Sequence, residues 1–218
     1  MESSSPKERS WFQHHFASPG QQLSAAKLGM WLFLAQEVLF FSGIFVAYGI
    51  YRTHHPEAFS IGSHLLDWKL GGLNTVVLLF SSLTAALAVR SSRIGDTRAT
   101  SRYLVLTIIC ACIFLVVKYF EYSAKFSHGL LPGKFFDPHD AGDLPYHVRS
   151  FFGIYFVATG VHGLHVLIGI GYFIFLWVRN NQGRFSPEYN TPIDMGALYW
   201  HLVDLIWIYL FPLLYLID

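Results

Sequence analysis

The feature that most constrains this chain is an apolar run over residues 151–178 that contains no Asp, Glu, Lys or Arg. As an α-helix of 28 residues it would extend about 42 Å, enough to cross a hydrocarbon core about 30 Å thick with some tilt. A run this apolar can face lipid only as a helix, because the hydrocarbon core offers no partner for backbone polar groups. The run therefore predicts a membrane-spanning helix.

Four further runs are long and apolar enough to span, at residues 28–51, 70–89, 103–120 and 195–217. The chain of 218 residues is 53% hydrophobic and only 13% charged, which is typical of a membrane protein. We therefore predict an all-α, five-helix bundle over residues 23–218, preceded by a polar tail at residues 1–22. The net charge of +1 gives no reason to expect a nucleic acid as partner.

The orientation of these spans is predicted by the Lys and Arg residues of their connections. Nine lie in the N-terminal tail, the second-to-third connection and the fourth-to-fifth connection, and five lie on the opposite side. Because basic residues favour the cytoplasmic side, we predict a cytoplasmic N-terminus and a C-terminus outside.

Four polar residues in the last two spans are expected to form an interhelical cluster: His162, His165, His201 and Asp204. Counted along the helices, His162 and Asp204 lie at one depth, whereas His165 and His201 lie at another, more cytoplasmic depth. Polar groups inside a membrane need partners, so we predict a hydrogen bond from His162 or His165 to Asp204 or His201.

Three interpretations of this cluster remain open. The first is structural, with the polar side chains bonding the helices together. The second is a proton relay, for which mid-membrane Glu, Asp and His are the usual components. The third is a carboxylate-bridged metal pair, but the Glu-x-x-His spacing of such bundles is absent.

Glu37 lies in the middle of the first span, with apolar neighbours and no basic residue three or four positions away. We expect a protonated carboxyl at or near a contact with a neighbouring subunit, and a proton-handling role is the alternative.

Near the end of the third span, Glu121 follows Lys118 by three residues and precedes Lys125 by four. This spacing predicts an ion pair at the membrane interface. Four residues of the connection that follows, Asp137, His139, Asp140 and Asp143, could bind a metal, although solvated loop acids are the simpler interpretation.

The sequence lacks the motifs of several well-known kinds of active site. The chain has no P-loop, no dinucleotide-binding glycine motif, no nucleophile elbow and no His-x-x-x-Cys copper loop. Its two cysteines, Cys110 and Cys112, are two residues apart in an apolar run, so neither a disulfide nor a metal pair is expected. We expect no redox centre and no metal in this chain.

Five motifs in order resemble subunit III of haem-copper cytochrome c oxidases. The two most specific are FVATGVHGLH at residues 156–165 and YWHLVDLIW at residues 199–207. The others are LGMW with EVLFFSG at residues 28–43, LNTVVLL at residues 73–79 and FEY at residues 120–122. The resemblance extends over about residues 25–218 and hence all five spans.

The resemblance implies a non-redox subunit that binds the catalytic subunit I, with subunit II in the same complex and haem and copper in those partners. Such subunits hold phospholipid and support proton uptake and oxygen access in subunit I. The chain lacks the first two helices of the seven-helix mitochondrial form and is similar to the five-helix bacterial, caa3-like form.

This comparison implies a bacterial cell membrane, with the mitochondrial inner membrane as the alternative. The complex would pump protons while passing electrons from cytochrome c to O₂. A quinol oxidase and, less in keeping with the motifs, an independent carrier or channel are the other functional hypotheses. A carrier should show internal repeats and discontinuous helices, and the sequence indicates neither.

Overall fold

The computed structural model describes residues 13, 15–131, 145 and 147–217. These residues form six helices and no β-strand: α1 (Pro19–His54), α2 (Pro56–His64), α3 (Trp68–Ile94), α4 (Thr97–Ser127), α5 (Val148–Asn181) and α6 (Thr191–Tyr215). Five of them are long and apolar enough to cross a membrane, which confirms the predicted five-span, all-α fold. The short α2 was not expected from the sequence.

Three of the five long helices, α1, α3 and α4, begin after a residue whose side chain caps the first turn. The Ser18 hydroxyl accepts from the backbone N–H of Gln21, immediately before Pro19 in the first turn of α1. Asp67 and Asp96 cap α3 and α4 in the same way. These side chains satisfy N–H groups that have no partner within the helix.

The helices extend beyond the apolar runs that predicted them. α1 starts at Pro19, inside the expected polar tail, and α5 continues to Asn181. The reason is that the hydrocarbon thickness limits only the apolar part of a helix, whereas capped polar turns continue it into the interface.

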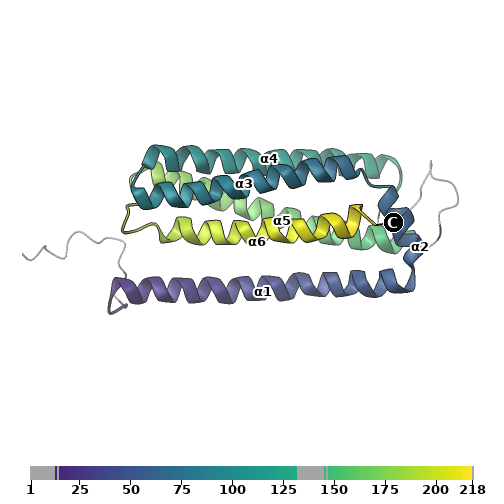
Figure 1. Ribbon diagram of the computed structural model, residues 1–218, viewed down its shortest axis with the longest axis horizontal. Helices are drawn as coiled ribbons and strands as arrows, with labels where there is room; N and C mark the ends of the chain where they lie inside the picture. Colours follow the sequence, from purple (N-terminus) through teal and green to yellow (C-terminus); the bar gives the residue numbers. More distant parts are fainter. Residues whose placement is uncertain (1–12, 14, 132–144, 146, 218) are drawn as a thin grey trace, which may run out of the picture.

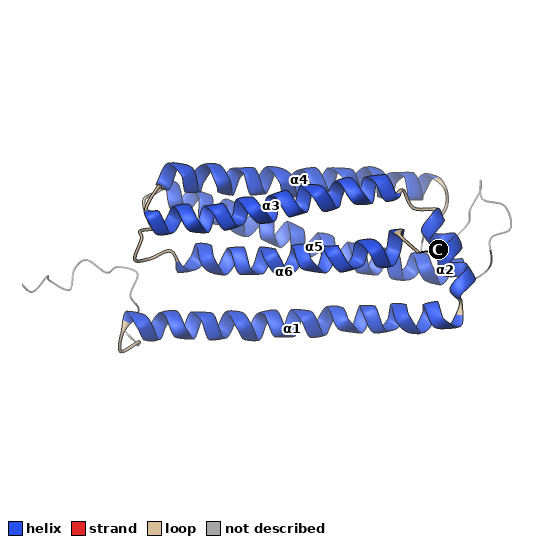
Figure 2. Cartoon of the chain, viewed as in Figure 1, coloured by secondary structure: helices blue, strands red, loops and turns tan. Residues whose placement is uncertain are grey.

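Helices α3, α4, α5 and α6 form a closed bundle in which each packs against two of the others: α3 against α4 and α6, and α5 against α4 and α6. α1 lies along the side of this bundle against α5 and α6 (Figure 1). Figure 2 shows α2 at the end of the bundle where α1 ends and α3 begins. We refer to this as the α2 end.

Large aromatic side chains fill the centre of the bundle, and Trp200 and Trp207 of α6 are completely buried. Trp200 packs over Gly169 of α5, where an added Cβ would lie only 2.5 Å from the indole ring. The glycine thus permits a close approach of α5 and α6, as small residues do between membrane helices.

α1 is much less enclosed than the rest. Its buried side chains are Leu34, Glu37, Phe41 and Tyr48, and most of its apolar surface is exposed. Glu37 is the only acidic residue among them, and a buried carboxyl group needs a hydrogen-bond partner on the bundle.

Candidate functional site

The first candidate site is a pair formed by Glu37 of α1 and His165 of α5, which we call the mid-span pair. The Nε2 atom of His165 lies 2.9 Å from Oε2 of Glu37. The Nδ1 atom of His165 lies 2.8 Å from the backbone carbonyl of Val161, one turn earlier on α5. Both nitrogens of the imidazole therefore have oxygen partners.

These two contacts determine how protons can be placed in the pair. A carbonyl oxygen only accepts, so Nδ1 of His165 must carry hydrogen and donate to Val161. The remaining contact then needs one proton, held either by the Glu37 carboxyl or by Nε2 of His165. The pair is electrically neutral overall in both arrangements, which lowers the cost of burial in a membrane.

Aromatic side chains enclose the mid-span pair. The ring of Phe41 meets the imidazole of His165 edge-on at a centroid separation of 5.2 Å. The hydroxyl of Tyr199 donates to the backbone carbonyl of His165 at 2.9 Å. Only 8% of the surface of Glu37 is exposed, so its contact with His165 is shielded from the surroundings of the protein.

The predicted cluster of four polar residues is not formed. His165 bonds to Glu37 on α1, and the Nδ1 atom of His201 lies 2.6 Å from the Ser82 hydroxyl of α3. Neither ring nitrogen of His162 and neither carboxyl oxygen of Asp204 has a hydrogen-bond partner in the described part of the chain. The predicted hydrogen bond from His162 or His165 to Asp204 or His201 was therefore wrong.

Rotation about the helix axis explains this error. Counting residues along α5 gives depth alone, whereas a step of three residues also turns the helix by about 300°, which is about 60° short of a full circle. His165 consequently faces α1, whereas His162 packs between Phe114 of α4 and Trp207 of α6. Matched depth is necessary for contact and does not establish it.

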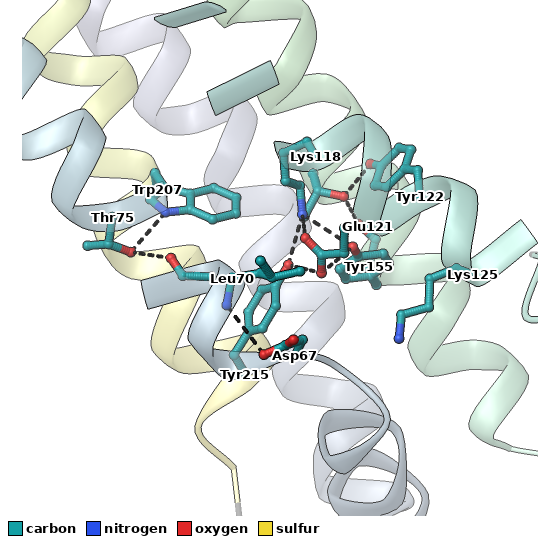
Figure 3. A network of polar contacts seen from close by, with 12 residues as sticks. Asp67, Leu70, Thr75, Lys118, Glu121, Tyr122, Lys125, Tyr155, Trp207 and Tyr215 are labelled. Carbon is teal, nitrogen blue, oxygen red and sulfur yellow. Dashed lines mark hydrogen bonds and ion pairs between the residues drawn. The ribbon is translucent and has the colours of Figure 1, made fainter. Parts of the chain in front are cut away.

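A second polar cluster lies at the α2 end of the bundle, between α4, α5 and α6 (Figure 3). The Nζ atom of Lys118 lies 2.9 Å from Oε2 of Glu121, and it also donates to the hydroxyl groups of Tyr155 and Tyr215. Both hydroxyl groups in turn donate to Oε1 of Glu121. We call these four residues the lysine cage.

Aromatic rings surround the charge of the lysine cage. The Lys118 ammonium lies between 5.0 and 5.5 Å from the ring centroids of Tyr122, Tyr155, Trp207 and Tyr215. Attraction of a cation by aromatic ring faces adds to the ion pair at such distances.

The ion pair of Lys118 and Glu121 was predicted, but its enclosure by side chains of other helices was not. Lys118 and Glu121 retain 7% and 2% of their surface, so the pair is buried. Lys125 instead donates to the backbone carbonyl of Leu65, just after α2. The spacing on α4 could not reveal that tyrosines from α5 and α6 close over this face.

The described residues contain no group of three or more His, Cys, Asp or Glu side chains that could hold a metal ion. The four loop residues considered as metal ligands, Asp137, His139, Asp140 and Asp143, lie outside the described residues. Cys110 is buried and Cys112 is exposed, and no disulfide joins them.

A known protein family matches almost the whole chain, including the residues of both sites. The family model described as "Cytochrome c oxidase subunit III" matches residues 12–136 and 145–218. The chain belongs to the cytochrome c oxidase subunit III family. Both members of the mid-span pair and all four members of the lysine cage lie within the matched residues.

Individual relatives agree with this assignment. The chain is 32% identical to "Cytochrome c oxidase subunit 3" of Corynebacterium diphtheriae over 88% of its own length and 87% of the relative. It is 30% identical to the protein of the same name from Thermostichus vulcanus over 88% and 87%. A relative from Papio hamadryas is 32% identical, over 94% of this chain and 74% of the relative.

Sequence reasoning missed the partners more than the charged residues themselves. Tyr155, Tyr215 and Ser82 were not singled out, because tyrosine and serine are common in membrane helices and show no spacing signal. A weak signal was available for Lys118, since a basic residue within an apolar run requires acceptors on other helices.

Proposed function

We propose that this chain is an accessory, non-redox subunit of a haem-copper oxidase that passes electrons from cytochrome c to O₂ and pumps protons. It would bind subunit I, with subunit II in the same complex and the haem and copper in those partners. The proposal rests on the family assignment and on relatives that are named as cytochrome c oxidase subunits.

The observation that carries the proposed role is the way in which α1 is attached. The mid-span pair joins α1 to α5 at 2.9 Å, while the opposite face of α1 is apolar and open. On that face Leu39 retains 72% of its surface, and Leu32 and Val46 are similarly exposed. We assign the mid-span pair the role of holding α1 in position beside subunit I, thereby stabilising the catalytic subunit.

A groove between α1, α3 and α6 supports the proposal of bound phospholipid. Its volume is about 370 Å³, and it is lined by Lys27, by the ion pair of Arg93 with Asp194, and by Trp31 and Leu198. Basic side chains beside an apolar wall fit a phosphate headgroup with its acyl chain. Bound lipid in this groove would fill the space between α1 and the bundle and assist proton uptake and oxygen access in subunit I.

We also propose a bacterial cell membrane as the location. The bacterial relatives and this chain match over similar shares of both lengths, 87–88%, whereas the Papio relative is covered to 74%. The described helices also correspond to the five-helix form expected for bacterial enzymes.

The function is tested by purifying the tagged chain from its native membrane in mild detergent. We expect co-purification of the catalytic subunits, a haem spectrum in the visible range and O₂ reduction with reduced cytochrome c. Turnover with a quinol but not with cytochrome c would replace the donor in this proposal. Purification without haem and without other subunits would refute membership of an oxidase complex.

The proposed orientation is tested by cysteine labelling in a variant lacking Cys110 and Cys112. Suitable exposed positions are His54 at the α2 end and Arg98 at the opposite end. A membrane-impermeant maleimide should label His54→Cys from outside and Arg98→Cys only after lysis. The reverse pattern would overturn a cytoplasmic N-terminus.

A further inference from the structure

Two histidines at the α2 end form a contact that the proposed function does not use. His55 lies between α1 and α2, and its backbone N–H donates to the carbonyl of Tyr51 at 2.9 Å. His147 lies at the start of α5. Their imidazole rings are stacked, with centroids 3.7 Å apart and planes inclined by only 9°.

Next to this stack, α2 packs against α5 through apolar side chains. Phe59 and Phe151 are completely buried and meet edge-on at a centroid separation of 5.4 Å. A Cβ added to Gly62 would lie 2.3 Å from the ring of Phe151, so the two helices are as close as a glycine allows. The stacked rings of His55 and His147 therefore lie at the edge of a close-packed contact between α2 and α5.

α2 also supports the ends of two long helices. The ring of Tyr48 of α1 packs against Phe59, and the backbone N–H of Ile217, just after α6, donates to the Ser63 hydroxyl at 3.4 Å. Movement of α2 away from α5 would consequently loosen α1 and the C-terminal end of α6.

The stack is exposed enough to respond to the pH of the surrounding solution. His147 is exposed and His55 is partly exposed. An open cavity of about 320 Å³ adjoins both rings. The other charged or histidine side chains within three residues of the two rings, in the described part of the chain, are Arg52 and His54 of α1, Glu57 of α2 and Arg149 of α5. Glu57 favours protonation of the imidazoles, whereas the two arginines and His54 in its charged form oppose it.

We propose that the stack of His55 and His147 is an acid-sensitive clasp, which holds α2 on α5 when both rings are neutral and releases it when both are protonated. Two like charges this close repel each other, and protonation also removes the favourable stacking of neutral rings. If the N-terminus is cytoplasmic, the clasp faces the side to which an oxidase releases protons.

The direction of the pH effect follows from the environment of His55. Partial burial lowers the pKa of this imidazole below 6.5, and the neighbouring His147 and His54 rings lower it further. An open α2 would therefore take up a proton more readily than the closed form. The clasp is complete above pH 6.5 and is progressively lost as the pH falls below that value.

The test is hydrogen–deuterium exchange of the intact complex in nanodiscs at pH 7.5 and 5.0, corrected for intrinsic exchange rates. Amides of residues 56–64 and 148–152 should open about fivefold more often at pH 5.0, the factor expected for two unit charges about 4 Å apart in a water-like dielectric. His147→Phe retains a stacking ring that cannot be protonated, and it should abolish this difference. His64→Phe, at the exposed far end of α2, is the matched control and should retain it.

Three outcomes would overturn the clasp. One is an absence of any pH effect in the unmodified complex. Another is a full effect that persists in His147→Phe and in a second variant, His55→Gln, which covers the case of poor folding of the first. The third is an effect that disappears in the presence of EDTA, since a bound metal rather than protons would then control α2. An equal effect with and without EDTA supports the proposal.

Discussion

The lysine cage and the mid-span pair are two buried ionisable sites in one chain, and they are built differently. In the lysine cage, Glu121 receives hydrogen bonds from Lys118, Tyr155 and Tyr215, which come from three helices. In the mid-span pair, Glu37 has one hydrogen-bond partner among the described residues, His165. The difference reflects position, since the cage lies between α4, α5 and α6, whereas α1 touches the bundle along one side.

This contrast indicates how each site tolerates change. The cage holds a full positive and a full negative charge, so removal of either leaves the other unpaired in a buried place. The mid-span pair needs only one proton between its two groups and stays neutral in either form. We therefore expect large effects in the cage, intermediate effects in the apolar packing of the bundle and small effects in the pair.

The largest effect is expected for Lys118→Met. Loss of the ammonium leaves the Glu121 carboxylate without its cation, which typically destabilises a protein by about 3–5 kcal/mol. The measurement is the free energy of unfolding in SDS–detergent mixtures, followed by tryptophan fluorescence.

The double variant Lys118→Met with Glu121→Gln provides the control, because it removes both charges and should recover most of the loss. Lys69→Met, at the exposed start of α3, should change stability little. If Lys118→Met were as stable as the unmodified chain, the cage would not be the stronger of the two sites.

An intermediate effect is expected where α5 and α6 pack most closely. Gly169→Leu would force a side chain against Trp200, where even a Cβ lies 2.5 Å from the ring, and overpacking typically costs about 1–3 kcal/mol. Gly171→Leu is the matched control, because no atom lies within 4 Å of a Cβ added there. Equal unfolding free energies for the two variants would contradict the close packing of α5 on α6.

The smallest effect is expected for Glu37→Gln. The amide can still donate to Nε2 of His165, and a single hydrogen bond between membrane helices contributes only about 0.6 kcal/mol on average. Assembly with subunit I and O₂ reduction should both remain close to those of the unmodified complex, as measured by subunit stoichiometry and turnover.

Glu37→Lys sharpens this test, because its ammonium would place a buried positive charge beside His165 without a carboxylate to balance it, and it should weaken association with subunit I. A Glu37→Gln complex that is intact but inactive would contradict the structural role and assign proton handling to Glu37.

The expectation for Glu37 shows that the sequence of a single helix does not identify the partner of a buried side chain. With no basic residue three or four positions away, Glu37 was expected to be a protonated carboxyl bonded to another subunit. His165 of the same chain instead lies 2.9 Å away, although it is 128 residues distant in sequence. Proximity to subunit I stays a prediction, while the bonding partner needed the folded chain to be identified.

The sequence by itself determined the five spans, since the number of helices follows from hydrocarbon thickness and from the length of each apolar run. It also determined the family, through motifs such as residues 156–165 and 199–207. The ion pair of Lys118 and Glu121 could likewise be predicted, because residues three apart share a helix face.

Only the tertiary structure decided which polar groups meet across helices. The sequence supplies depth along each helix, but contact also requires the rotation of each helix and the identity of its neighbours. His162 and His165 are three residues apart and nevertheless face different helices. Tyr155 and Tyr215 complete the lysine cage only because α5 and α6 pack there on α4, a result of packing the whole bundle that no local pattern contains.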